Sequence, residues 1–420
     1  METIMEAVHL MESKKSDEAI ALLEDYLPIA DEEERFTIAE LFIQWGFLEE
    51  ASNILQDLLQ QYPHESDIKI TLADIYIELE NDEKAIQLLN DISEDDESYL
   101  QALIQLADLY QAQGLFEVAE QKLLVAKQLN PAEPIIDFAL GELLFSTGDY
   151  LKAITYYERI IGVTKEMANV SIPGRLAESY AAIGEYEQAL AIYQDTGHED
   201  PDTLFKYGLT AFQAGRKDIS IKAWEHVIDI DPYYHTVYYQ LAKAYEAEEL
   251  PNEAYKTAKK GLQVDEFNKE LFFYAGSLAY RLNENKESEK WMRQAIALDP
   301  DYKEAILSLI EILKANDSYS DIIDLIEEIK KTGASDPLYE WELARAYNET
   351  DSYKNALNHY QEAYNTLNKD SEFLKEYAYF LTEEGRIADA LPIFKAYLYE
   401  QPEDYEVEEF YHRLDDETDR

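Results

Sequence analysis

The sequence predicts an all-α fold, a solenoid of about twelve stacked helical hairpins with a capping helix at its C-terminal end. Three observations support this prediction. Small residues recur along nearly the whole chain, mostly at intervals of 34 residues. A second series of small residues lies twelve positions before the first. Glycine and proline recur at fixed places around both series, where turns and junctions are needed.

Two small residues per repeat indicate two antiparallel helices that cross closely. A side chain at such a crossing can be no larger than alanine or serine, and each helix supplies one. Apolar residues at helical spacing, such as Leu72, Tyr76, Ile86 and Leu89, surround these sites. The first helices carry Ala7, Ala39, Ala73, Ala107, Gly141, Ala177, Gly208, Ala242, Gly276, Ala344 and Ala378, and the second carry Ala19, Ala51, Ala85, Ala119, Ala153, Ala189, Ser220, Ala254, Ser288, Ala356 and Ala390.

Turn residues fall where a helical hairpin requires them. Glycine between the two helices of a pair permits a left-handed cap, and these glycines are Gly46, Gly114, Gly148, Gly184, Gly215 and Gly385. Proline stops one helix and is tolerated in the first turn of the next. The prolines expected at the junctions between repeats are Pro63, Pro131, Pro201, Pro232, Pro300 and Pro402.

Together these features resemble the tetratricopeptide repeat. That repeat has small residues at its eighth and twentieth positions, an aromatic residue between them and a closing proline. The aromatic residues here are Tyr76, Tyr110, Tyr180, Tyr245 and Tyr347. The resemblance covers essentially the full length, although residues such as Lys69, Leu103, Tyr238 and Phe272 replace the usual early tryptophan. Length and acidity further resemble the YpiA-like cytoplasmic repeat proteins of Gram-positive bacteria, which implies a binding protein.

The spacing is irregular in two places. The interval from Ala153 to Ala189 is 36 residues and the next, to Ser220, is 31. We therefore predict an acidic N-terminal lobe over 1–165 and a C-terminal lobe over 166–402, with a hinge or merely a longer turn at 162–174. In the tenth unit Ile310 and Ile322 fill both small sites, and their bulk predicts a wider hairpin over 303–333.

The last segment predicts a cap for the open end of the solenoid. An apolar stripe of Tyr405, Phe410, Tyr411 and Leu414 predicts a capping helix over 403–414, followed by a frayed tail over 415–420. An exposed solenoid end would otherwise present an apolar face to water.

The negative net charge of the chain limits the kinds of partner that it is expected to bind. The chain has 88 acidic and 36 basic residues, a formal net charge of -52. Such a chain repels a phosphate backbone, so nucleic acid is not an expected partner. Residues 1 to 100 alone carry 27 acidic and five basic side chains, which either keep the solenoid soluble or attract a basic partner. The chain shows neither a signal peptide nor a membrane-length apolar run, so we expect a cytoplasmic protein without membrane insertion.

No motif for catalysis is present. The sequence contains no Walker-type phosphate loop, no dinucleotide fingerprint, no HExxH and no GxSxG. It has no cysteine, and none of its seven histidines shares a ligand-spaced helical face with another histidine. We therefore expect no catalytic residue, no metal site and no cofactor.

The resemblance implies that certain positions of each first helix line a concave groove. In the early units these positions form an acidic lining of Glu33, Glu40, Asp67, Asp74, Glu78 and Asp108. In the later units they form a candidate partner-binding set of Phe205, Lys206, Tyr239, Lys243, Phe273, Tyr274, Arg281, Trp341 and Arg345. Aromatic residues and arginine often dominate binding energy, although several of these aromatics would also fit between adjacent units. Of the set, we expect Lys243, Arg281, Trp341 and Arg345 to be the more available to a partner.

These features predict a non-catalytic adaptor or scaffold that binds a protein or peptide in the groove. The partner would be an internal segment or an amphipathic helix, basic at one end. The alternative is a self-assembling structural protein whose repeat faces stack into oligomers. Sequence leaves the oligomeric state and the identity of the partner open.

Overall fold

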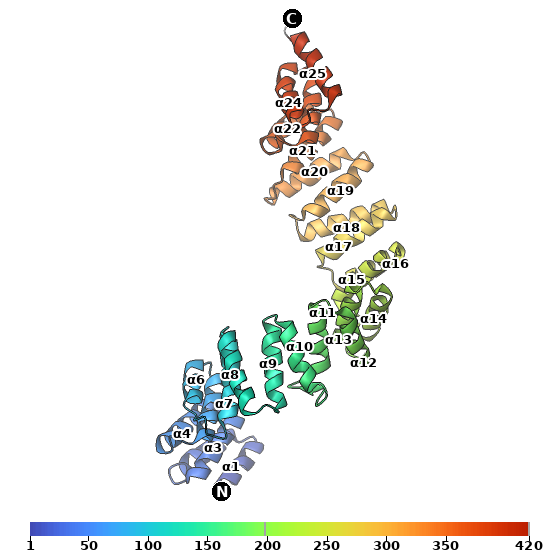
Figure 1. The fold of residues 1–420 in the computed structure, drawn as a ribbon. Coiled ribbons are helices and arrows are strands. Elements are labelled where there is room, and N and C mark those ends of the chain that lie inside the picture. Colours follow the sequence, from blue (N-terminus) through green and yellow to red (C-terminus); the bar gives the residue numbers. More distant parts are fainter. Residues whose placement is uncertain (197–198, 419–420) are drawn as a thin grey trace. The chain divides into compact units, whose positions relative to one another are not determined.

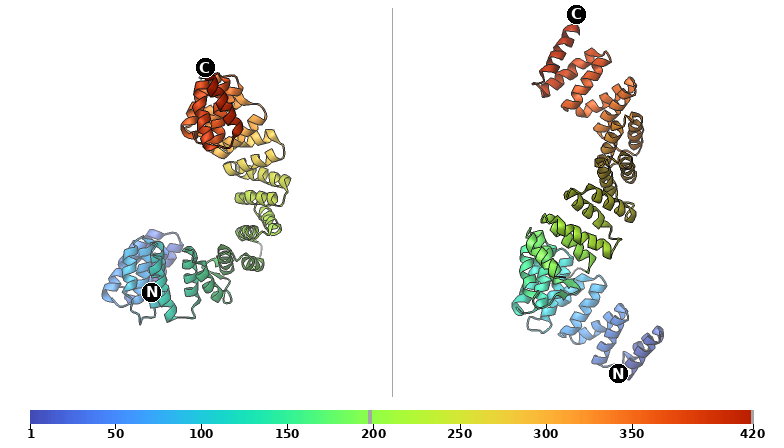
Figure 2. Two further views of the ribbon diagram at one scale, coloured as in Figure 1. Left: turned by 45° about the horizontal axis from the view of Figure 1, so that its top comes forward. Right: turned by 90° about the vertical axis from the view of Figure 1, so that its right-hand side faces the viewer.

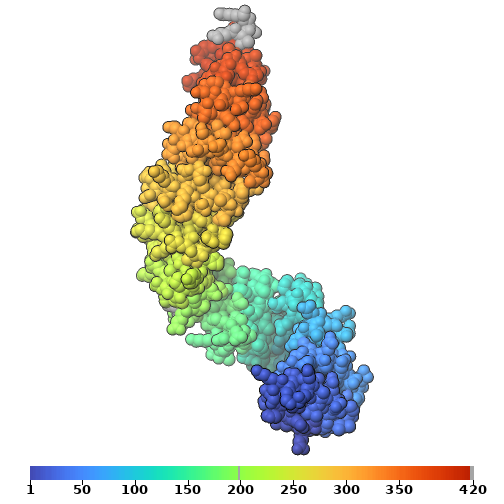
Figure 3. Space-filling model, turned by 180° about the vertical axis from the view of Figure 1, so that it is seen from behind, coloured from blue at the N-terminus to red at the C-terminus, as the bar shows by residue number. Residues whose placement is uncertain are grey.

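The computed structural model describes residues 1–196 and 199–418, which form 25 helices and one short two-stranded sheet (Figure 1). The chain divides into two compact units, Met1–Ala214 and Gly215–Arg420. Within each unit the helices pack against their neighbours in chain order, as the steady succession of colours along each unit in Figure 3 shows. This arrangement confirms the predicted all-α repeat architecture.

Unit 1 consists of six helical hairpins and a final single helix. Its helices are α1 (Glu2–Glu12), α2 (Ser16–Tyr26), α3 (Glu32–Gln44), α4 (Leu48–Gln61), α5 (Ser66–Glu78), α6 (Asp82–Asn90), α7 (Tyr99–Ala112), α8 (Phe116–Leu129), α9 (Pro134–Ser146), α10 (Tyr150–Ile160), α11 (Ile172–Ala182), α12 (Tyr186–Asp195) and α13 (Pro201–Gln213). Strands β1 (Glu166–Met167) and β2 (Val170–Ser171) lie between α10 and α11.

Unit 2 begins with a single helix and continues with five hairpins and a last helix. Its helices are α14 (Lys217–Ile230), α15 (His235–Ala247), α16 (Pro251–Val264), α17 (Lys269–Arg281), α18 (Asn285–Leu298), α19 (Lys303–Ala315), α20 (Tyr319–Lys331), α21 (Pro337–Glu349), α22 (Tyr353–Leu367), α23 (Ser371–Glu383), α24 (Ile387–Glu400) and α25 (Tyr405–Thr418). Figure 2 shows the hairpins of each unit as paired, antiparallel helices.

The small residues lie at the helix crossings, as predicted. Every small residue of the second helices, from Ala19 to Ala390, is fully buried. In the hairpin of α17 and α18 the Ser288 hydroxyl donates to the Gly276 carbonyl across the crossing, at 2.8 Å. A Cβ added to Gly276 would lie 2.9 Å from Cε of Met292, so a larger side chain there would push the helices apart.

A left-handed residue marks the turn of each of these hairpins. Five of these turns use predicted glycines, with φ between 71° and 84°, and the sixth predicted glycine, Gly215 between α13 and α14, has a φ of 76°. The other turns place a residue with a side chain in the same backbone conformation, at some energetic cost. These residues are Lys14, Glu80, Glu249, Asn283, Asp317 and Asp351. The turn geometry is therefore set by helix packing even where the sequence lacks glycine.

The division between the units differs from the prediction. It lies at Ala214/Gly215 instead of 165/166. The irregular segment at 162–174 instead holds the β1–β2 hairpin, in which Glu166 pairs with Ser171 and Met167 with Val170. Ala168 and Asn169 both have positive φ, as a two-residue hairpin turn requires. Helices α10 and α11 pack against each other across this segment, and one apolar cluster runs from Tyr157 to Leu176.

The hairpin of α19 and α20 is wide, as its two isoleucines predicted. Its helices make fewer close backbone contacts than those of any other hairpin within either unit. Ile310 and Ile322 are both fully buried and belong to one core cluster. Two branched side chains at the crossing therefore keep the helices apart without leaving apolar surface exposed.

The capping helix exists but is longer than predicted. Helix α25 continues to Thr418, so residues 415–418 are helical, and 419–420 lie outside the described residues. Val407 and Leu414 are buried, and Phe410 and Tyr411 are partly buried against the same cluster. Tyr405 is 73% exposed and does not belong to the buried stripe.

Candidate interaction surface

The predicted acidic lining lies on the first helices of three successive hairpins of unit 1. Glu33 and Glu40 project from α3, Asp67, Asp74 and Glu78 from α5, and Asp108 from α7. Intervals of seven and four residues place the acids of one helix on one face. All six side chains are exposed. None of them forms an ion pair with lysine or arginine in the part of the chain that the structure describes.

Hydrogen bonds between first helices join these acids into one surface. The side-chain amide of Gln105 on α7 donates to Asp74 Oδ1 on α5 at 2.7 Å. The Ser98 hydroxyl, next to the start of α7, makes a longer contact of 3.4 Å with Asp67 Oδ1. First helices therefore lie side by side, and their acids gather on a common face of unit 1.

Two of the carboxyl groups are desolvated although water reaches them. Burial by the surrounding protein raises the pKa of Asp108, for which the described residues offer no hydrogen bond or ion pair. Burial also raises the pKa of Asp74, and the neighbouring charge of Glu78 adds to this, while the Gln105 hydrogen bond opposes it. An exposed carboxylate with a raised pKa indicates a recessed surface whose negative charge is not balanced locally.

A cavity of about 580 Å³ opens at one end of the acidic lining. Its polar walls come from acids that include Glu33 and Asp67, and its apolar floor comes from Phe36, Leu58 and Ile68. The full set of lining residues is Asp31, Glu32, Glu33, Phe36, Leu58, Glu65, Asp67 and Ile68. An apolar floor between carboxylates suits a segment that carries both apolar and basic side chains.

The predicted partner-binding set is divided between the two units. Phe205 and Lys206 lie on α13 in unit 1. Phe205 is half-buried, and Lys206 is already paired, with its Nζ 2.6 Å from Glu178 Oε1 on α11. The other seven residues lie on α15, α17 and α21 in unit 2.

On α15 and α17 two aromatic rings pack against each other, and Tyr274 and Arg281 share an acidic partner. The rings of Tyr239 and Tyr274 meet edge to face with centroids 5.2 Å apart, and Lys243 lies 5.3 Å from the Tyr239 ring centroid. The Tyr274 hydroxyl and the Arg281 guanidinium both donate to Glu246.

Phe273 packs against a neighbouring hairpin. Its ring lies 5.3 Å from that of Tyr302, and its side chain is half-buried. Phe273, like the aromatic pair on α15 and α17, therefore serves partly as a contact between units of the repeat.

On α21 the predicted anchors belong mainly to the core. Trp341 is only 7% exposed, contrary to the expectation that it would be available to a partner. Its Nε1 donates to Glu376 at 2.9 Å, and its ring packs edge to face on Phe373. The Arg345 guanidinium lies over the Trp341 ring at 4.0 Å and binds Glu376 through Nε and Nη2.

Glu376 is the residue that sequence reasoning missed. It accepts hydrogen bonds from Trp341, from Arg345 and from the Tyr360 hydroxyl at 2.8 Å. Burial alone would lower the pKa of Arg345, but the hydrogen bonds and charges of Glu376 and Glu342 outweigh it and raise that pKa. A cavity of about 490 Å³ adjoins this group, lined by Lys314, Tyr319, Arg345, Asn348, Glu349, Tyr360, Glu376, Tyr379, Phe380 and Glu383.

No helix in the described part of the chain combines the length and apolar character needed to cross a bilayer.

Comparison with known proteins agrees with this architecture. Models of YpiA-like tetratricopeptide repeats match residues 111–163, and models of the C-terminal repeats of the same proteins match 337–404. General tetratricopeptide-repeat models match 46–103, 174–204 and 270–302.

Among solved structures, the chain is similar to MamA protein, with 21% identity and a TM-score of 0.36 over 41% of this chain and 94% of that chain. YrrB, described as a TPR protein with an unusual peptide-binding site, shows 15% identity and a TM-score of 0.38 over 44% and 96%. The Cut9-Hcn1 hetero-tetramer structure of APC/C shows 12% identity and a TM-score of 0.33 over 97% and 95%.

Among curated proteins, the TPR repeat-containing protein YpiA of Bacillus subtilis (strain 168) is 41% identical over 419 residues, covering 99% of both chains. With twelve repeats of the expected spacing and this full-length similarity, the chain belongs to the YpiA-like family of tetratricopeptide-repeat proteins.

Proposed function

We propose that this chain is a non-catalytic adaptor that binds a basic, amphipathic segment of a partner protein along the acidic lining of unit 1. Tetratricopeptide repeats support a protein-interaction scaffold in general, and proteins of this class are generally non-catalytic. The choice of the binding surface and the chemistry expected of the partner rest on the charges described above.

The observation that carries the proposal is the unbalanced charge of the acidic lining. Its six carboxylates have no lysine or arginine partner among the described residues, and desolvation raises the pKa of Asp74 and Asp108. A bound lysine or arginine would supply the missing charge in a recessed site, where water screens it less than at an open surface. The lining therefore gains favourable interactions when a cation binds, and this favours a basic partner.

The apolar floor narrows the chemistry of the partner further. Phe36, Leu58 and Ile68 lie between the carboxylates of the 580 Å³ cavity. A purely basic peptide would leave this floor exposed to water, whereas an amphipathic segment would cover it. We therefore expect apolar and basic side chains to alternate at helical or extended spacing in the bound segment.

Unit 2 supports partner binding less strongly. Lys206 in unit 1 and Arg281 and Arg345 in unit 2 are already neutralised by glutamates, and Trp341 is buried. Tyr239, Lys243 and Phe273 remain half-exposed, so we retain them as a second contact surface.

Affinity enrichment with two charge-matched variants tests the proposal. The lining variant is Asp74→Asn, Glu78→Gln and Asp108→Asn. The control is Glu49→Gln, Glu83→Gln and Glu117→Gln, three exposed acids on the second helices α4, α6 and α8. Both variants remove three negative charges from the same unit.

The expected result is that wild type and control recover the same partners and the lining variant loses them. Recovery should also fall as the salt concentration of the wash rises. Recovery of the same partners by all three proteins would reject the lining as the binding surface. Light scattering on the same samples tests the alternative of self-assembly. Oligomers that dissociate only in the lining variant would show that the lining binds other copies of this chain, and the adaptor proposal would then be rejected.

A further inference from the structure

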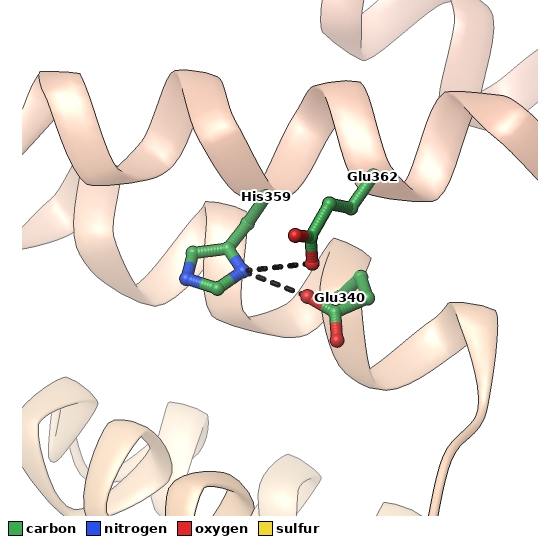
Figure 4. A group of neighbouring side chains, drawn as sticks. All are labelled: Glu340, His359 and Glu362. Carbon is green, nitrogen blue, oxygen red and sulfur yellow. Dashed lines mark hydrogen bonds and ion pairs between the residues drawn. The ribbon is translucent and has the colours of Figure 1, made fainter.

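Three metal-ligating side chains converge on the hairpin of α21 and α22, far along the chain from the acidic lining (Figure 4). His359 and Glu362 lie three residues apart on one face of α22, and Glu340 faces them from α21. His359 Nδ1 lies 2.7 Å from Glu340 Oε2 and 4.0 Å from Glu362 Oε2. One ligand atom from each residue lies within 4.8 Å of the others.

The imidazole ring is held in place by its surroundings. It stacks on the ring of Tyr347 with centroids 5.3 Å apart and planes inclined by 4°. The side chains of His359 and Glu340 are each only 16% exposed. Helices α21 and α22 also pack together as closely as any pair in the described chain, so the three ligands are carried by a rigid support.

The separations are close to those of a metal site. Ligand atoms about 2.1 Å from a zinc ion lie roughly 3.4 Å apart in a tetrahedral arrangement. The two Nδ1 to oxygen distances, 2.7 and 4.0 Å, lie on either side of that value. Small side-chain rotations would therefore bring all three atoms into a coordination shell without moving a helix.

Two carboxyl groups and one lysine determine the charge around the cluster. Burial would raise the pKa of Glu340, but hydrogen bonds from His359 and Lys330 outweigh it and lower that pKa to about 2. The hydrogen bond with Glu340, and then burial, raise the pKa of Glu362. Lys330 Nζ lies 2.6 Å from Glu340 Oε1, which leaves Oε2 on the side of His359.

We propose that Glu340, His359 and Glu362 bind a divalent transition-metal ion of the Zn²⁺ type. One imidazole and two carboxylates suit Zn²⁺ or Co²⁺, whereas Mg²⁺ and Ca²⁺ prefer ligand sets made of oxygen alone. The ion joins α21 to α22. Water completes the shell, because the chain supplies three ligands. The sequence predicted no metal site because no two histidines share a helical face, and this cluster needs only one.

Titration of the full chain with Zn²⁺ and with Co²⁺ tests this proposal, with calorimetry for affinity and visible absorption for Co²⁺ ligation. His359→Gln and Glu362→Gln remove one ligand each. His9→Gln is the matched control, since His9 and Glu12 have the same three-residue spacing with a contact of 3.9 Å, and they belong to no three-ligand group in the described chain. Circular dichroism checks that each variant is folded.

We expect one tight Zn²⁺ site in the wild type and in His9→Gln, and at least about tenfold weaker binding in the two ligand variants. Lys330→Gln should tighten Zn²⁺ binding at least about twofold, because it removes a competing positive charge. Mg²⁺ should not compete. Equal Zn²⁺ affinity of wild type and His359→Gln would overturn the proposal and assign the binding to dispersed surface carboxylates.

Discussion

The first helices at the start of unit 1 differ from those of unit 2 in how their charged residues are balanced. In unit 1 the acids on α3, α5 and α7 lack basic partners among the described residues, and two of them have raised pKa values. In unit 2 Arg281 on α17 and Arg345 on α21 are paired with glutamates, and Glu376 alone receives hydrogen bonds from three side chains. Ion pairs therefore link first helices in unit 2 and in the later part of unit 1, where Lys206 binds Glu178, whereas the acids on α3, α5 and α7 remain available.

The turns of the two units differ in a similar way. Four of the six hairpins wholly within unit 1 turn at a glycine, whereas four of the five in unit 2 turn at glutamate, asparagine or aspartate. A side chain in the left-handed region costs about 1 kcal/mol or more. Unit 2 therefore contains more turn strain than unit 1.

The largest effect should follow from Glu376→Gln in unit 2. The substitution removes the charge that Arg345 binds in a partly buried site, and we expect local stability around α21 to α23 to fall by about 2 kcal/mol. Hydrogen exchange of the backbone amides in these helices measures this, because a repeat protein need not unfold in one step. Glu178→Gln, which affects the more exposed partner Lys206, should cost less than about 1 kcal/mol. Equal losses of stability in the two variants would contradict the expectation that the more buried ion pair of Glu376 stabilises its helices more than the exposed pair of Glu178 does.

A smaller gain should follow from Glu249→Gly. Glu249 has a φ of 58° in the turn between α15 and α16, and glycine adopts that conformation without strain. We expect unit 2 to gain about 1 kcal/mol, measured as the shift of the denaturant midpoint. Glu249→Ala removes the same side chain but keeps Cβ, so it should give no gain. A comparable gain in the alanine variant would show that the glutamate charge, not the turn, is the cause.

Asp108→Asn should stabilise unit 1 slightly, by about 0.5 kcal/mol at neutral pH. Because the folded pKa of Asp108 is raised, the native state binds a proton more readily than the unfolded state does. Native stability of the wild type therefore increases as pH falls through the raised pKa, and the difference from Asp108→Asn disappears there. Thermal unfolding of both proteins between pH 3 and 7 checks this, and a difference that persists at the lowest pH would exclude desolvated charge as the cause.

Asp404 should show the opposite pH dependence, with a smaller effect because the site is open to water. Hydrogen bonds from Lys375 and Tyr397 lower the pKa of Asp404 to about 2. Its stabilising contribution is therefore present above the usual aspartate pKa and is lost as pH falls toward 2. Hydrogen exchange of α25 in the wild type and in Asp404→Asn measures it. If acid weakened α25 equally in both proteins, Asp404 would not be the responsible group.

Local composition predicted the repeats because each hairpin is specified by its own residues. The small residues at the helix crossings, the glycines in the turns and the bulk of Ile310 and Ile322 each act within one repeat. Each of these features could therefore be found without knowing the fold. The division at Ala214/Gly215 could not be found in this way, since the irregular spacing at 162–174 is absorbed by a β-hairpin.

The surfaces were only partly predictable for a related reason. The resemblance assigned the acidic lining to α3, α5 and α7, but whether a charge is paired depends on residues of other helices that lie far along the chain. Arg345 meets Glu376 31 residues later, and His359 meets Glu340 19 residues earlier. Trp341 was expected to face a partner and instead packs on Phe373 of a neighbouring hairpin. The sequence did contain one sign that Glu376 belongs to a patterned position, because Glu342 and Glu376 occupy equivalent positions in successive repeats.

Because the hairpins share left-handed turns, such a chain can gain or lose whole repeats without a change of turn geometry. Gly46 and Glu80 are 34 residues apart and have the same backbone conformation, with φ of 83° and 56°. Excising the segment between them removes one second helix and the following first helix, and the cut ends rejoin in matching geometry. Growth or loss by whole modules therefore preserves the stacking pattern, whereas a change of any other size turns apolar faces toward solvent.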